Sequence, residues 1–366
     1  MKLNLLREEL LPALQTVSGV VEKRQTLPIL SNLLLVTSND RITLTATDME
    51  VELIAVINKT MEDAGEVTLS ARKLLDICRA LPEQAIMRLN TDGDRVVLTS
   101  GKSRFMLSTQ PAQEYPLIEM ADKILEFSVS QSNFKALLER TAFAMAQQDV
   151  RYYLNGLLLE LEKNRLRAVA TDGHRLALCD TEIEGTVVQP IQIIVPRKGV
   201  TELVKLLQEE EENINVQISA NHIRIDLGNL RYTSKLIDGK FPDYVRVIPE
   251  ENKHPVFADK GLLRQSLTRA SILSNEKYRG VRLFLEQGVL RALAHNPEQE
   301  EAEEEIEVDY DGDVMEIGFN VSYLLDALAI IETERVKISI SDPNSSCLLM
   351  ADAPSACKFV VMPMRL

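Results

Sequence analysis

The spacing of apolar and polar residues changes period along the chain, and the changes recur in the same order. Apolar residues three and four apart indicate amphipathic helices, whereas alternation of apolar and polar residues indicates half-buried strands. Each repeat reads as a helix, two or more strands, a second helix and further strands, over about 120 residues. The predicted helices cover residues 7–17, 69–81, 131–145, 195–207, 260–273 and 319–331.

One short motif shows the repeat directly. Asp172 follows an apolar run, Asp48 lies 124 residues before it, and Asn296 lies 124 residues after it. Aspartate and asparagine accept hydrogen bonds from backbone N–H groups in tight turns. We therefore predict that these three side chains cap equivalent turns.

The repeat predicts the domain organisation. A chain of 366 residues is too long for one ordinary core, and a period this long is typical of tandem domains. Strands run consecutively and helices are few, which is an α+β pattern. We predict three similar domains, at residues 1–124, 125–248 and 249–366.

Several residues predict where helices begin and end. Ser70 and Asn320 are favourable N-caps, and Pro196 suits the first position of a helix. Pro82 is expected to end the helix before it. Pro12 lies inside the first predicted helix, which we expect to begin late or to kink there.

Charge is distributed unevenly. The net charge is −14, which opposes ordinary nucleic-acid binding, but the three predicted domains carry −3, −2 and −9. Most of the acid lies in residues 298–316. Two predicted helices instead begin with cations, Arg72-Lys73 and Arg197-Lys198, where the helix dipole disfavours them. Either these cations accompany a bound phosphate, or they are solvated pairs.

The chain is predicted to be soluble and cytoplasmic, because its N-terminal segment contains acids where a signal peptide is apolar. No apolar run approaches a membrane span, so no membrane partner is expected. The four cysteines contain no CxxC spacing and are predicted to be free, buried thiols, without a disulfide or a metal site. No histidine spacing suits a metal, and no cofactor is predicted.

Asp172 and His174 resemble a general acid–base pair, so a hydrolase is the alternative function. The repeat argues against it, because Asp172 has counterparts in the other copies and therefore has a structural role. His174 and Arg175 have no counterparts in the other two copies. The special role of this segment is expected to reside in those two residues.

Two further segments attract attention. "QQDVRYYLNG" (147–156) combines tyrosines, glutamines and Arg151, which can stack on or hydrogen-bond to nucleic acid; ordinary strand packing is the alternative. The final "KFVVMPMRL" is apolar to the last residues. Methionines suit adaptable binding grooves.

Long motifs then give a resemblance over the whole chain. "RYYLNG", "ATDGHRLA", "VPRKGV", "FPDY", "SNEKYRGVRL", "NPEQEEAEE" and "VVMPMRL" occur in order, and with the triple repeat they resemble the β-subunit family of bacterial DNA polymerase III, the sliding clamps. The resemblance implies two chains joined head to tail in a pseudo-sixfold ring around duplex DNA. Helices would line the central hole, antiparallel sheets would lie outside, and the protein would have no catalytic activity.

The resemblance also implies partners and site residues. An ATP-dependent clamp loader would load the ring, and the polymerase α subunit, other polymerases and repair proteins would bind through short peptides between domains 2 and 3. DNA contacts are expected at Arg24, Arg72, Gln148, Tyr152 and Tyr153, with Lys198 added from the helix-end argument. The peptide pocket is expected at Leu154, Thr171, Gly173, His174, Arg175, Leu176, Pro242, Arg246, Val247, Tyr278, Asn320, Tyr323, Ser346, Val360, Val361, Met362, Pro363, Met364, Arg365 and Leu366. The interface of a homodimer is expected at Lys73, Lys102, Arg104, Phe105, Ile272, Leu273, Glu298, Glu300, Glu301, Glu303 and Glu304.

Overall fold

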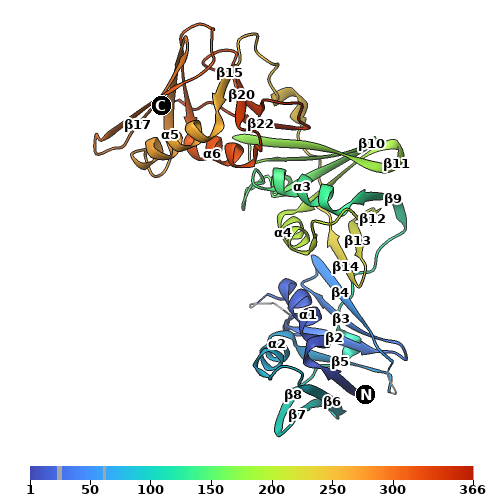
Figure 1. Ribbon diagram of the computed structural model, residues 1–366. Coiled ribbons are helices and arrows are strands. Elements are labelled where there is room, and N and C mark those ends of the chain that lie inside the picture. The colour runs from blue at the N-terminus through green and yellow to red at the C-terminus, as the bar shows by residue number, and fades with distance from the viewer. Residues whose placement is uncertain (23–26, 61–62, 366) are drawn as a thin grey trace. The chain divides into compact units, whose positions relative to one another are not determined.

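The computed structural model describes residues 1–22, 27–60 and 63–365, and the chain forms two compact units (Figure 1). We describe each unit by itself. Unit 1 comprises Met1–Lys135, Ile183–Gly185 and Lys198–Ile237, and unit 2 comprises Ala136–Glu182, Thr186–Arg197 and Asp238–Leu366. Among the described residues, no helix is both long and apolar enough to cross a membrane.

Unit 1 contains two antiparallel sheets and a pair of packed helices, α1 (Arg7–Val17) and α2 (Ala71–Ala80). The strand orders are β1-β6-β7-β8 and β9-β12-β13-β14-β4-β3-β2-β5. Helix α4 (Arg197–Leu206) also lies here, apart from its first residue. The strands are β1 (Lys2–Leu6), β2 (Asn32–Thr37), β3 (Arg41–Thr47), β4 (Val51–Asn58), β5 (Gly65–Ser70), β6 (Ile86–Asp92), β7 (Arg95–Ser100), β8 (Ser103–Ser108), β9 (Lys123–Ser130), β12 (Asn213–Ser219), β13 (His222–Leu227) and β14 (Leu230–Lys235).

Unit 2 repeats this plan with helices α5 (Lys260–Ile272) and α6 (Val321–Ile330), which lie side by side (Figure 1). One sheet has the order β15-β20-β21-β22-β11-β10, and the other has β18-β17-β16-β19. Most of α3 (Gln131–Ala142) also belongs to this unit. The strands are β10 (Gly156–Thr171), β11 (Arg175–Pro196), β15 (Val256–Asp259), β16 (Gly280–Glu286), β17 (Val289–His295), β18 (Glu301–Glu307), β19 (Met315–Asn320), β20 (Arg335–Ser339), β21 (Cys347–Ala351) and β22 (Cys357–Val361).

Apolar helix faces explain this packing. Leu10 and Leu14 of α1 are fully buried, as are Leu74 and Cys78 of α2, and α1 packs on both α2 and β4. The Arg7 side chain adds a polar link, because its Nε donates a hydrogen bond to the Cys78 carbonyl at 3.0 Å. Burial of each such leucine contributes about 1.5–3 kcal/mol. Repeated core positions thus produce repeated helix pairs.

The predicted α+β class and all six predicted helices are confirmed. Ser70 caps α2 by accepting a hydrogen bond from Lys73 N, and Asn320 caps α6 through Ser322 N. Helix α2 ends before Pro82, as expected. Helix α1 begins at Arg7 and contains Pro12, so it does not begin late. One detail of the prediction is wrong: Pro196 is the last residue of β11 rather than the first of α4.

The prediction of four free cysteines is also wrong. Cys179 and Cys357 form a disulfide, whereas Cys78 and Cys347 are free and buried. The two bonded residues face each other in the antiparallel pairing of β11 with β22. They are 178 residues apart in sequence. Their spacing therefore carried no signal of the bond before the strand register was known.

Candidate functional site

The segment between β10 and β11 is a tight turn built around Asp172. The Asp172 Oδ1 accepts hydrogen bonds from His174 N at 2.9 Å and Arg175 N at 3.0 Å. Gly173 has a φ of +87°, a conformation that glycine adopts without strain. The predicted role of Asp172 as a turn cap is confirmed.

The counterparts of Asp172 act in the same way. Asp48 Oδ1 accepts hydrogen bonds from Glu50 N at 2.9 Å and Val51 N at 2.7 Å. Asn296 Oδ1 accepts one from Glu300 N at 2.9 Å, in a longer loop. In all three copies, the aspartate or asparagine side chain at this position thus accepts hydrogen bonds from backbone N–H groups of its own turn or loop.

Arg175 joins the turn to helix α6. Its Nε donates to Asp172 Oδ2 at 3.1 Å, its Nη1 pairs with Asp326, and its Nη2 donates to the Phe143 carbonyl at 2.9 Å. The guanidinium also lies 4.6 Å from the centre of the Tyr323 ring, a favourable cation–π contact. With a side chain only 13% exposed, Arg175 fixes the wall of the site.

His174 and Tyr323 present a stacked pair beside that wall. Their ring centres are 6.4 Å apart and nearly parallel, at 17°. Burial raises the pKa of the Tyr323 hydroxyl, and the nearby Asp172 carboxylate raises it further, so this tyrosine stays neutral. The pair offers flat surfaces and polar edges, a combination that suits a peptide.

The C-terminal segment is hydrogen-bonded to the same turn. Met362 N donates to the His174 carbonyl at 2.9 Å, and Met364 N donates to the Gly318 carbonyl at 2.8 Å. Residues 362–364 therefore continue past β22 and along β19 as ordered backbone. Leu366 lies outside the described residues.

The remaining predicted pocket residues differ in burial. Leu154, Leu176, Val360 and Val361 are buried, as is Thr171, whereas Asn320, Ser346 and Pro363 are half-buried. Pro242, Arg246 and Val247 are exposed, in or next to the short helix Tyr244–Val247. The Tyr244 hydroxyl holds this helix by donating to Glu160 Oε1 at 3.1 Å and accepting from Arg167 at 3.3 Å.

The geometry excludes the catalytic reading of Asp172 and His174. Both Asp172 carboxylate oxygens are occupied by backbone N–H groups and by Arg175. The His174 ring makes no hydrogen bond to Asp172 among the described atoms. In the described part of the chain, no group of three or more histidine, cysteine or acidic side chains could hold a metal.

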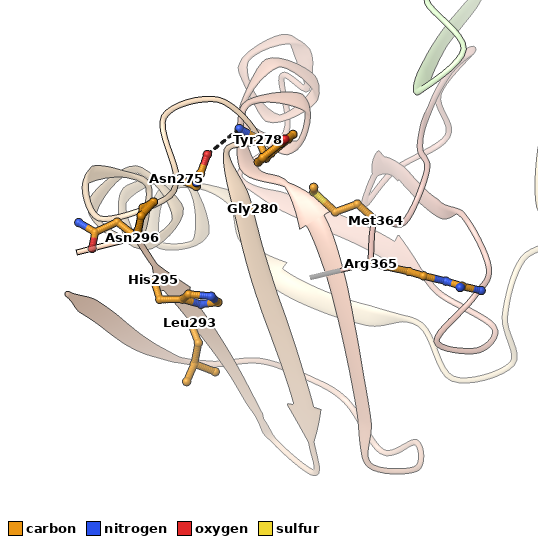
Figure 2. A pocket seen from close by; sticks show the side chains of 9 residues that line it. Asn275, Tyr278, Gly280, Leu293, His295, Asn296, Met364 and Arg365 are labelled. Atoms are coloured by element: carbon orange, nitrogen blue, oxygen red, sulfur yellow. Dashed lines mark hydrogen bonds between the residues drawn. The ribbon is translucent and has the colours of Figure 1, made fainter. Parts of the chain in front are cut away.

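A cavity of about 340 Å³ adjoins the predicted pocket (Figure 2). It shares Tyr278, Met364 and Arg365 with the predicted set. The other lining residues were not predicted as part of the pocket, although four of them lie in the motifs SNEKYRGVRL and NPEQEEAEE and Leu293 is an apolar residue at an outward-facing position of β17. The missed lining residues are Asn275, Gly280, Leu293, His295, Asn296 and Pro297.

The residues expected to contact DNA lie in both units. In unit 1, Arg72 is exposed and lies 3.8 Å from Asp76. In unit 2, Gln148 is exposed, and Tyr152 and Tyr153 form an edge-to-face pair with ring centres 5.7 Å apart. These tyrosines lie in a 3-10 helix, Tyr152–Leu154, so strand packing does not explain them. Arg24 lies outside the described residues.

Lys198 is already paired with protein carboxylates. Its Nζ contacts both Glu22 and Asp48. Burial lowers the pKa of Lys198, but the hydrogen bonds to Asp48 and Glu22 outweigh it and raise that pKa overall. The phosphate reading of this helix end therefore competes with a structural ion pair that the sequence analysis did not foresee.

The expected interface residues lie on two edge strands, in the segments just before those strands, on helix α2 and at the end of helix α5. Strand β8 ends the sheet of unit 1 and carries exposed Arg104, and β18 ends a sheet of unit 2 and carries exposed Glu301 and Glu303. Ile272 is 73% exposed. Glu304 instead pairs with Arg269 at 2.5 Å within the chain. Lys73, Lys102, Glu298 and Glu300 are exposed, whereas Phe105 and Leu273 are half-buried.

Comparison with known proteins covers the whole chain. Profiles of the DNA polymerase III beta subunit match its N-terminal domain at residues 1–119, its central domain at 128–243 and its C-terminal domain at 245–365. The beta sliding clamp of Pseudomonas putida is 52% identical, with 98% of each chain covered. That of Escherichia coli K12 is 48% identical, with both chains fully covered.

A solved structure agrees with this result. The DNA polymerase III subunit beta from Pseudomonas aeruginosa superposes with a TM-score of 0.97 at 50% identity, and each chain is covered completely. The resemblance seen in the motifs is therefore confirmed in sequence and in fold. The chain belongs to the DNA polymerase III beta subunit family, the sliding clamps of DNA replication.

Proposed function

We propose that two copies of this protein form a closed ring around duplex DNA and tether the replicative polymerase through a peptide pocket in unit 2. The observation that carries the tethering is the assembly of His174, Tyr323 and Met362 around the Arg175 ion pairs. These residues join a rigid wall to a partly exposed, amphipathic surface. A short peptide with leucine or phenylalanine anchors fits such a surface.

The ring is proposed from charge and from sheet edges. The edge strand β8 follows Lys102 and contains Arg104, whereas the edge strand β18 contains five glutamates. Pairing of these edges from two chains would bring opposite charges together and satisfy unpaired backbone groups. Such a contact is heterologous, so it must close to avoid filaments. We place its domains at 1–124, 125–248 and 249–366.

A closed ring reconciles DNA binding with a net charge of −14. An ordinary DNA-binding protein needs many phosphate contacts and loses affinity steeply with salt. A ring holds DNA topologically, so weak contacts from residues such as Arg72 and Tyr152 suffice. The protein would then act in the cytoplasm without catalysing a reaction or carrying a cofactor. A clamp loader would open it with ATP.

The test of the ring uses the topology of the DNA. The protein is loaded onto nicked circular plasmid with a bacterial clamp loader and ATP, and then separated by gel filtration in 0.5–1 M salt, where ordinary phosphate contacts are weak (on the order of a 3 Å screening length). We expect it to stay with the plasmid and to leave once a restriction enzyme cuts the DNA. Equal retention on circular and linear DNA would contradict the proposal.

A further inference from the structure

We propose that the 340 Å³ cavity beside Tyr278 extends the peptide groove and receives an apolar side chain from the residues that flank the partner's anchor. This inference rests on the proposed peptide pocket and adds a further contact to it. The cavity lies around the start of β16. Figure 2 shows Leu293 and His295 on one side of Gly280, with Met364 and Arg365 on the other.

Continuity supports a peptide as the occupant. Met364 and Arg365 continue directly from Met362, whose N–H is held by the His174 carbonyl. The Met364 N–H is in turn held by Gly318, so the chain between the two sites is fixed backbone. A peptide lying along residues 362–364 therefore needs only a few more residues to reach the cavity.

The lining is apolar where a side chain would enter. Leu293 is 38% exposed and Tyr278 is 54% exposed, although both types usually gain by burial. Gly280 contributes no side chain between them, and Met364 supplies an adaptable edge. The volume falls within the range of about 300–1,000 Å³ that is typical of ligand sites.

Polar groups at the rim favour an extended backbone. Asn275 Oδ1 accepts hydrogen bonds from Lys277 N at 2.9 Å and Tyr278 N at 3.1 Å. These bonds fix the orientation of the amide. Among the described residues, neither Asn275 Nδ2 nor the exposed His295 ring donates a hydrogen bond. Both can therefore donate to carbonyl groups of a bound peptide.

The surrounding charge disfavours nucleic acid as the occupant. Glu298, Glu300 and Glu301 follow Pro297 and are exposed in the single chain, whereas in the proposed ring they would face the cations of β8. In the single chain their carboxylates repel a polyanion, whereas a peptide segment with one apolar side chain and free carbonyl groups meets no such penalty. The chemistry of this cavity thus points to a linear peptide.

The test compares synthetic peptides by fluorescence anisotropy on the intact protein. One labelled peptide contains only a leucine–phenylalanine anchor. Two longer peptides extend it by four residues at each end, with leucine in both extensions or with serine at the same places. We expect the leucine form to bind about tenfold more tightly than the serine form, which corresponds to about 1.4 kcal/mol.

Leu293→Asn should reduce this tenfold difference to less than threefold and leave the affinity of the anchor-only peptide unchanged. Val314→Asn is the matched control, because Val314 is exposed just before β19, at the strand end far from the cavity; it should keep the full difference. Equal binding of the two long peptides, or a difference that survives Leu293→Asn, would overturn the inference alone. Failure of the wild-type protein to bind even the anchor peptide would instead reject the peptide pocket and this extension together.

Discussion

In two places, strands from successive repeats pair to join their sheets. The backbone arrangement is the same in both places, but the exposed side chains differ. In unit 1, β4 pairs with β14, and Lys235 N donates to the Glu50 carbonyl at 2.8 Å. In unit 2, β11 pairs with β22, and Met362 N donates to the His174 carbonyl at 2.9 Å. Each junction follows an aspartate-capped turn. We call them the first and second junctions.

The two junctions differ at the start of the helix that packs beside each of them. The third residue of α4 is Gly199, where an added Cβ would lie 2.5 Å from Ser234 Oγ. The third residue of α6 is Tyr323, which stacks on His174. Glu52 is buried at the first junction, where its carboxylate accepts a hydrogen bond from Ile118 N at 2.9 Å. The two junctions therefore have the same backbone arrangement, and a few side-chain differences determine whether a binding surface forms there.

The largest expected effect comes from removing residues 362–366, which follow β22 at the second junction. Deletion of residues 362–366 should abolish polymerase binding, because it removes the hydrogen bond to His174 and the Met364 edge. The protein should still be a dimer by analytical ultracentrifugation. Polymerase that still binds the shortened protein in a pull-down would disprove the assignment of the pocket.

The ion pairs of the two junctions can be compared next. Arg175→Ala should weaken binding of the anchor peptide more than 100-fold and destabilise unit 2 by about 3 kcal/mol, because two carboxylates lose their partner. Lys198→Ala is the matched change at the first junction and should leave peptide affinity unchanged. Anisotropy and thermal unfolding measure the two effects. An equal loss of peptide affinity in both variants would refute the distinction between the junctions.

The disulfide gives a third contrast. At the first junction, Ala55 faces Leu230 where the second has Cys179 facing Cys357. Reduction should therefore destabilise β22 by about 2 kcal/mol and leave β14 unchanged, as measured by hydrogen exchange of their amides. A Cys357→Ala variant should not respond to reductant, and an equal response would show that the effect has another source.

The smallest effect concerns the buried Glu52. Burial raises the pKa of its carboxyl group, against the lowering effect of the Ile118 N–H and of Arg224. A raised pKa means that the folded state holds the proton more tightly, so stability falls as pH rises through the folded pKa. Glu52→Gln should raise the melting temperature by about 1–2 °C at pH 8 and by nothing at pH 4. A gain at pH 4 as large as that at pH 8 would contradict this reading.

Much of the fold could be predicted from the sequence because its signals are local. Helical periodicity located all six helices, and Ser70 and Asn320 identified two helix starts. The aspartate turns were predictable because a side chain that caps its own turn depends on neighbours two or three residues away. Pro196 was placed wrongly because strand pairing with Gly156 overrides its helix preference.

The parts that escaped prediction depend on contacts between distant residues. The bond between Cys179 and Cys357 required the register of two strands. The pairing of Lys198 with Asp48 required a junction between repeats, and no local pattern encodes it. The candidate site was located by resemblance, yet its cavity wall at Leu293 appeared only when β17 was placed beside β16.

The difference between the two junctions has a consequence for stoichiometry. In a ring of two chains, the two first junctions would lack the stacked surface of His174 and Tyr323, so the proposed peptide pockets would number two. A third partner could then bind only after one of the two bound peptides had dissociated, whatever its local concentration. The rate at which one partner replaces another would then be limited by dissociation from these two pockets. A mutation that created a third peptide-binding surface near Gly199 would therefore change the rate of partner exchange more than the affinity for any one partner.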